Sequence, residues 1–430
     1  MTEVSLTRLN NVASHKLIGG GVRNVNVSLQ YYDRQLAASL PNFAYFHIYG
    51  LQRHLGDLKA GMSSEDSSLK PSYEVPKWIT ADLLDVGEDM ISSWENVYCE
   101  DPDNPDRDPP GYIGYRNVLR DAHREYKALF EAQEEMRSSG RFLSSIVTAM
   151  PKMPFTTSLR ISDRPNRIQE KDAYFLDRDY YASMRALMLA PHTWSDAAVL
   201  YTRPDFDPPG ELLHKLPVAI HEAGTVLRQI TIQCSTPWSY ETLRMSLSER
   251  SSLVASVQSL DAFSLLVDGI NGRNGWILPI NEGAPGLVFD LLSSFMSTSS
   301  LSKLTIAFPE FGLRPSCLFE VLNRTPDAQP RTVRLKGAAF YLRELQKYLD
   351  HFDLPCELIL EVPDLIVGSW VDLAECLHNH PMVSTVILSS WGGDLENPEK
   401  RTQWISDEEK RLNDYLQKRT HVNPFINNEA

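Results

Sequence analysis

A short apolar stretch with strand-like alternation recurs along the last two thirds of the chain, and it constrains the fold more than any other feature. Each copy is followed by a polar break and by a segment with apolar residues three or four apart, the spacing of a helix that buries one face. Alternation with period 2 indicates a strand with one buried side. The copies begin at Leu159, Leu227, Leu260, Leu301, Val333, Leu358 and Val383.

The distance between the copies indicates a repeat. Equivalent positions lie 29 residues apart from Leu304 to Val333, then 25 residues to Leu358 and 28 to Val386, which is in the range of leucine-rich repeats. Strand, helix and strand with short links favour parallel strands joined by right-handed crossovers. We therefore predict an α/β fold, an irregular leucine-rich-repeat-like solenoid of parallel strands backed by helices. Because the repeats lack a regular asparagine, an open doubly wound sheet is the alternative fold.

The N-terminal third has a different pattern. It offers one more strand, Val22–Val27, and then helical spacing over 34–58, whose middle, 43–48, fits a strand equally well. Further helices are predicted at 78–98, 115–136 and 142–150. Between the repeat strands we expect helices at 210–226, 241–257, 286–296, 316–323, 341–352 and 370–378.

These patterns divide the chain into three regions. A strand and helical region comes first, then the solenoid, then a capping helix with a tail. The capping helix is predicted because Ser406 and Glu409 have the spacing of a capping box, and a repeat array needs its last apolar face covered. The regions are 1–150, with acidic or polar loops at 61–77 and 100–113, then 151–397, and finally 398–430.

Composition limits the classes of partner. The 430 residues include 42 Lys and Arg against 56 Asp and Glu, a net charge of -14, so the chain as a whole repels phosphate backbones and anionic lipids. We therefore expect neither nucleic-acid nor membrane binding. The start of the chain is polar and no apolar run is long enough to span a bilayer, which predicts a cytoplasmic or nuclear protein.

Motifs that carry chemistry are incomplete. The five cysteines include no C-x-x-C pair, which argues against a zinc site or a disulfide framework. His221-Glu222 begins like a zinc-protease helix, but Thr225 stands where the second histidine is needed. Residues 101–108 alternate carboxylates as a calcium loop does, without its glycine and final glutamate. His378–His380 resembles a nuclease motif but fits a helix end better. We expect no metal, no cofactor and no catalytic residue.

Several segments together resemble a family of filamentous-fungal proteins described as F-box or leucine-rich-repeat-like. They are residues 22–33, 126–135 and 139–143 and the strand at Leu159, and the likeness spans roughly residues 5 to 395. The resemblance implies a substrate receptor of a ubiquitin ligase, with an F-box that binds the ligase adaptor and a repeat region that binds a partner. The chain departs from the family pattern because only about twenty residues precede Val22, too few for the three helices of an F-box.

The positive candidate is a surface on the predicted sheet. Side chains that alternate with the buried ones face outward. Several are cationic although the chain is acidic, and Glu357 and Glu361 then reverse the sign. Such a mixture of charges suits a protein or peptide partner, among them a ubiquitination substrate. The alternative is an enzyme with a site built from loops at the sheet edge, using His221, Asp268 or His380. The predicted partner-binding residues are Arg160, Gln229, Thr231, Gln233, Lys303, Thr305, Arg334 and Lys336, with Trp391 as an aromatic anchor.

Overall fold

The computed structural model divides the chain into two compact units, which are described separately. The sheet unit consists of Glu3–Leu29, Phe142–Arg164 and Arg203–Ala430, and the helical unit consists of Gln30–Arg141 and Pro165–Thr202 with Met1–Thr2. The predicted boundary at residue 150 therefore differs from the division in the structure. The residues described are 2–63, 80–98, 112–164, 180–194, 208–235, 240–268, 284–308, 316–325, 328–389 and 406–425.

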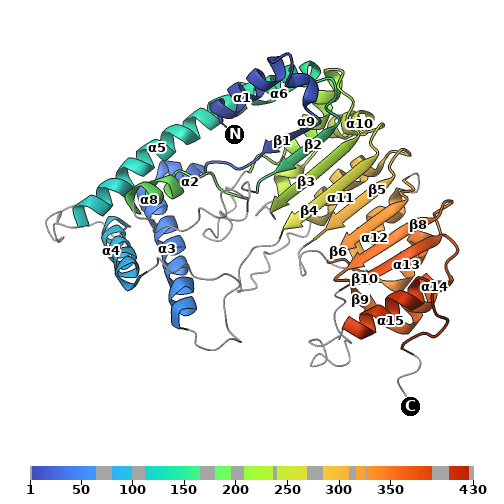
Figure 1. Cartoon of the computed structure of the whole chain (residues 1–430). Helices are drawn as coiled ribbons and strands as arrows, with labels where there is room; N and C mark the ends of the chain where they lie inside the picture. Colours follow the sequence, from blue (N-terminus) through green and yellow to red (C-terminus); the bar gives the residue numbers. More distant parts are fainter. Residues whose placement is uncertain are drawn as a thin grey trace. The chain divides into compact units, whose positions relative to one another are not determined.

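The core of the sheet unit is one open parallel sheet of eight strands (Figure 1). All neighbouring pairs are parallel. The order follows the sequence in one direction, whereas a doubly wound sheet reverses direction at a switch point. The strands are β1 (Asn24–Ser28), β2 (Ser158–Ser162), β3 (Gln229–Ser235), β4 (Ala262–Asp268), β5 (Lys303–Ala307), β6 (Thr332–Lys336), β8 (Cys356–Glu361) and β10 (Val383–Ser389).

Helices back one side of this sheet (Figure 1). Along most of the strands, every second side chain is buried on that side. In β5, Leu304 and Ile306 are fully buried, while Lys303, Thr305 and Ala307 are not. Phe263 of β4 stacks on Phe295, with ring centroids 4.5 Å apart. The predicted helical segments are confirmed as α9 (Leu212–Glu222), α10 (Leu247–Ser256), α11 (Ala284–Met296), α12 (Ser316–Arg324), α13 (Leu342–Leu349) and α14 (Trp370–Asn379).

Smaller elements complete the sheet unit. The short strands β7 (Ala339–Tyr341) and β9 (Asp364–Val367) form a second, two-stranded parallel sheet, which the sequence pattern did not predict. Helices α1 (Glu3–Ser14) and α6 (Arg141–Ala149) stand before β1 and β2, each followed by a 3-10 turn.

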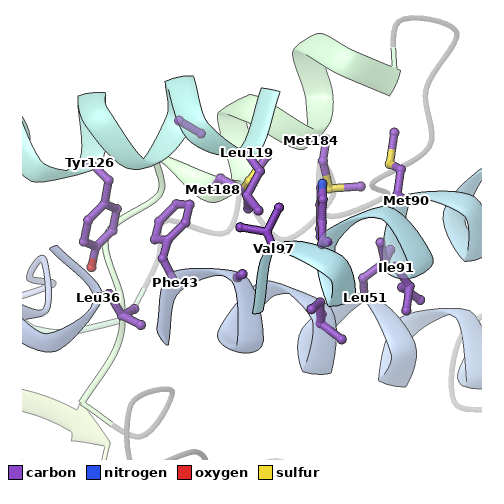
Figure 2. Close-up of a cluster of buried hydrophobic side chains, with 14 of the residues drawn as sticks. Leu36, Phe43, Leu51, Met90, Ile91, Val97, Leu119, Tyr126, Met184 and Met188 are labelled. Carbon is purple, nitrogen blue, oxygen red and sulfur yellow. The ribbon is translucent and has the colours of Figure 1, made fainter. Parts of the chain in front are cut away.

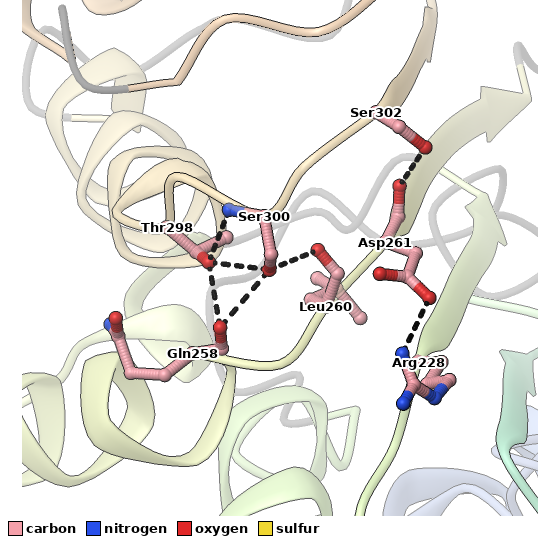
Figure 3. A network of polar contacts seen from close by, with 7 residues as sticks. All are labelled: Arg228, Gln258, Leu260, Asp261, Thr298, Ser300 and Ser302. Atoms are coloured by element: carbon pink, nitrogen blue, oxygen red, sulfur yellow. Dashed lines mark hydrogen bonds and ion pairs between the residues drawn. The ribbon is translucent and has the colours of Figure 1, made fainter.

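Hydroxyl side chains connect the segments that precede β4 and β5. Thr298 and Ser300, which precede β5, both donate hydrogen bonds to the Gln258 carbonyl oxygen at 3.0 Å (Figure 3). The Ser302 hydroxyl donates to the Asp261 carbonyl oxygen at 2.9 Å. These carbonyls precede β4 and lie one unit back in the sequence. Small hydroxyl residues thus tie the segment before β5 to the segment before β4.

We expect Thr298→Val to lower the free energy of unfolding of the sheet unit by about 1 kcal/mol. The substitution keeps the shape of a side chain that is 1% exposed but removes its bond to the Gln258 carbonyl oxygen. Urea unfolding followed by circular dichroism measures the change. Thr305→Val on the open side of β5 is the matched control, and an equal loss in both variants would contradict the role of the Thr298 hydroxyl.

The predicted capping helix is confirmed as α15 (Ser406–Leu416), which packs beside β10 and α14. Its Asn413 side chain accepts a hydrogen bond from the Leu388 backbone N–H and donates one to the Leu388 carbonyl oxygen, both at 2.9 Å. His378 of α14 stacks on Tyr415, with ring centroids 4.2 Å apart. One side-chain amide therefore occupies backbone groups at the free edge of β10.

The helical unit has its own apolar core. Figure 2 shows Phe43 of this core beside Tyr126, with ring centroids 5.2 Å apart. Leu51 and Leu119 belong to the same cluster of buried side chains. The segment 43–48, which fitted a strand equally well, is helical in the structure. The helices of this unit are α2 (Arg34–Ala38), α3 (Leu40–Ser63), α4 (Ala81–Tyr98), α5 (Tyr112–Ser138) and α8 (Tyr180–Met188).

Candidate binding face

The side of the large sheet opposite its buried side carries three rows of side chains, which we call the binding face. The strand pairing brings the rows into register across all eight strands. None of these side chains is fully buried. The middle row is Asn26, Arg160, Thr231, Ser264, Thr305, Arg334, Ile359 and Ile387. The rows on either side are Asn24, Ser158, Gln229, Ala262, Lys303, Thr332, Glu357 and Thr385, and Ser28, Ser162, Gln233, Leu266, Ala307, Lys336, Glu361 and Ser389.

The structure brings eight of the nine predicted partner-binding residues onto this face. Arg160, Gln229, Lys303, Arg334 and Lys336 are exposed, and the remaining three are half-buried. Alternation along the strands placed them on the correct side. The ninth, Trp391, lies outside the described residues, as does the candidate calcium loop at 101–108.

Two of the four cations on the binding face are held by neighbouring side chains. The Arg160 guanidinium donates to the Gln233 carboxamide oxygen. The Arg334 guanidinium forms an ion pair with Glu361, whose side chain is only 20% exposed. A partner that used these arginines would have to compete with internal contacts, which lowers the gain from each one.

Sequence reasoning missed the apolar part of the binding face. Ile359 of β8 is register-paired with Ile387 of β10, and the Ile387 side chain is 36% exposed. Polar residues flank the pair, including Glu357, which accepts a hydrogen bond from the Thr332 hydroxyl at 3.3 Å. Both isoleucines could have been recognised as outward-facing, because each stands between two buried positions of its own strand.

The residues of the alternative enzyme hypothesis do not come together. His221 is exposed near the end of α9 and His380 follows α14, so both precede a strand and lie toward the amino ends of the sheet. Asp268 is the last residue of β4, at the carboxyl end. A seven-residue strand is roughly 23 Å long. His380 instead contacts Asp350, with 3.4 Å between Nε2 and Oδ1.

A buried carboxylate does lie at the carboxyl ends of the strands, where it holds the backbone. Asp163 follows β2 and is fully buried. Its Oδ1 accepts a hydrogen bond from the Ser235 N–H at 2.9 Å, and its Oδ2 accepts one from the Ser235 hydroxyl at 2.6 Å. A hydroxyl that donates to a carboxylate lacks the histidine base that activates a serine nucleophile. This pair fixes the end of β3 to the end of β2.

Metal and thiol chemistry find no support in the part of the chain that the structure describes. No cluster of three or more metal-ligating side chains occurs among those residues. Burial raises the pKa of Cys356 to about 11, so its thiol is protonated and unreactive at neutral pH. Within the same described ranges, no helix is long and apolar enough to cross a bilayer.

Comparisons with family models, with curated proteins and with solved structures find no match for this chain.

Proposed function

We propose that this chain is a non-enzymatic protein-recognition module that holds a protein partner on the binding face. The observation that carries the proposal is the register of the eight parallel strands, which aligns polar, charged and apolar side chains in three continuous rows. Protein interfaces combine these types of side chain, with charges that give specificity.

The size of the face fits such a role. Eight strands about 4.8 Å apart span roughly 34 Å, and five residues along a strand span roughly 17 Å. The product is roughly 600 Å², close to the ~800 Å² that each partner contributes to a standard protein complex. A small molecule needs a concave pocket instead.

We further propose that the sheet unit is an irregular leucine-rich-repeat-like solenoid. Its support is the one-directional strand order, together with the hydroxyl bonds that join the segment before β5 to the segment before β4. The resemblance to F-box and leucine-rich-repeat-like proteins adds the hypothesis that the partner is a ubiquitination substrate, bound in the cytoplasm or nucleus.

Site-specific photo-crosslinking tests the proposal. A benzophenone amino acid placed at Thr231 or at Thr305 is expected to crosslink the same partner from a cell extract, because both positions share the middle row. At Ser252, which is exposed on α10, it should not. Ser264→Arg, which adds a large side chain between the two positions, should reduce the crosslinked product about tenfold. Equal crosslinking from Ser252, or no effect of Ser264→Arg, would contradict the proposal.

A further inference from the structure

The cations of the binding face are not equivalent. The face carries four cations and two carboxylates, although the whole chain has a net charge of -14. Arg160 and Arg334 are held by side chains on other strands. The ammonium groups of Lys303 and Lys336, by contrast, form no hydrogen bond or ion pair with any other described residue, and both side chains are exposed. The free positive charge of the face is therefore concentrated on β5 and β6.

The backbone positions of the two lysines have a defined separation. Lys303 pairs with Thr332, and Ala307 pairs with Lys336. The lysines thus stand on adjacent strands and are offset by four residues along the strand direction. At about 3.3 Å per residue this offset is roughly 13 Å. Thr305 and Ala307, which follow Lys303 on the β5 side of the face, are small. Arg334 on β6 is large, but its guanidinium is paired with Glu361 on β8, so an extended chain can lie along β5.

The neighbouring strands limit what can bind. On β8, Glu357 and Glu361 repel an anion, while Leu266 on β4 adds apolar surface beside Ala307. A polyanion such as a nucleic acid meets only two free cations before it reaches these carboxylates, and each phosphate contact needs its own cation. Two carboxylates spaced to match the lysines fit the arrangement better.

We propose that the occupant of β5 and β6 is an extended acidic segment of a partner protein, with two carboxylates four residues apart that meet Lys303 and Lys336. An extended peptide also places residues four apart at roughly 13 Å. This inference rests on the proposed function, because it names the chemistry of the partner on the same face.

Selection from a phage-displayed library of random twelve-residue peptides tests the inference. On the wild-type protein we expect enrichment of peptides with Asp or Glu at positions four apart. A synthetic peptide from the selection should bind about threefold more weakly to Lys303→Gln or to Lys336→Gln, and about tenfold more weakly to the double variant, as for exposed ion pairs. Binding measured by fluorescence anisotropy should weaken as salt is added.

Lys347→Gln is the matched control, because Lys347 is exposed on α13, away from the binding face. Binding to this variant should stay within about twofold of wild type. The inference is overturned if no peptide is enriched, if the enriched peptides lack paired acids, or if the double variant binds them equally well. The inference is also overturned if the wild-type protein binds a single-stranded oligonucleotide more tightly than it binds the selected peptide at physiological salt.

The crosslinking experiment separates this inference from the proposed function. One outcome is that the double lysine variant still crosslinks the partner from Thr231 and Thr305 while Ser264→Arg abolishes the product. In that case recognition by the face stands, and the inference that the partner presents an acidic segment is wrong. If none of these substitutions alters the crosslinked product, both are wrong.

Discussion

Replacement of Asp163 by alanine is expected to lower the free energy of unfolding of the sheet unit by roughly 3 kcal/mol. The substitution leaves the backbone N–H and the hydroxyl of Ser235 without their acceptor, and Ser235 is 1% exposed. Each buried donor that loses its partner costs about 1–3 kcal/mol. Urea unfolding followed by tryptophan fluorescence measures the loss.

Two further variants identify the cause. Ser235→Ala removes only the hydroxyl contact to Asp163 and should cost about 1 kcal/mol. Asp163→Asn keeps one acceptor oxygen and should fall between the two alanine variants. If Asp163→Ala unfolds at the same urea concentration as wild type, the two hydrogen bonds between Asp163 and Ser235 contribute nothing to stability.

The helical unit is expected to lose stability as the pH falls below about 6.5. Burial first, and then the nearby His192, lower the pKa of His47 well below its ordinary value of 6.5. Its ring packs against Phe43, with centroids 4.4 Å apart, and its Nε2 has no hydrogen-bond partner among the described residues. The unfolded chain therefore binds a proton that the folded unit resists.

The sign follows from linkage. Below the unfolded pKa the unfolded state holds more protons, so the free energy of unfolding falls with pH by up to about 1.4 kcal/mol per pH unit for one histidine. Burial also lowers the pKa values of His54 and His123, which steepens the loss. Urea unfolding followed by circular dichroism from about pH 8 to about pH 5.5 measures it. The range stays above the acid region, where burial raises the pKa of Asp33 and adds the opposite slope.

His47→Leu provides the control for this pH dependence. An apolar side chain of similar volume removes the titrating group and its unpartnered nitrogen, so we expect a flatter pH profile and a gain of stability near pH 6. An unchanged slope in the variant would assign the acid sensitivity to other groups. His221→Leu, at an exposed position in the sheet unit, should leave the profile as it is.

The parallel sheet was predictable because its signal is local. In β5, Leu304 and Ile306 alternate with Lys303 and Thr305, and this pattern requires one buried side whatever the partners are. The same alternation identified which side chains face outward. The strand order was expected from the repeated pattern, because strands that follow one another in sequence are neighbours about two-thirds of the time.

The contacts on the binding face were not predictable in the same way. The ion pair of Arg334 with Glu361 is diagonal, since Arg334 is register-paired with Ile359. It therefore depends on the register between β6 and β8 and on two side-chain rotamers. The division into units in the structure differs from the predicted one for a related reason. The residues of α8 contribute Met184 to the core of the helical unit, a contact over long sequence distance that composition does not reveal.

The edge of the large sheet at β10 has a feature that bears on self-association. An edge strand with free N–H and C=O groups is a template for another strand. At β10 the carboxamide of Asn413 already binds both the N–H and the carbonyl oxygen of Leu388. A second molecule that tried to extend the sheet there would have to displace α15 first. The Asn413 carboxamide thus helps to prevent the edge-to-edge strand pairing through which β-sheet proteins form fibres.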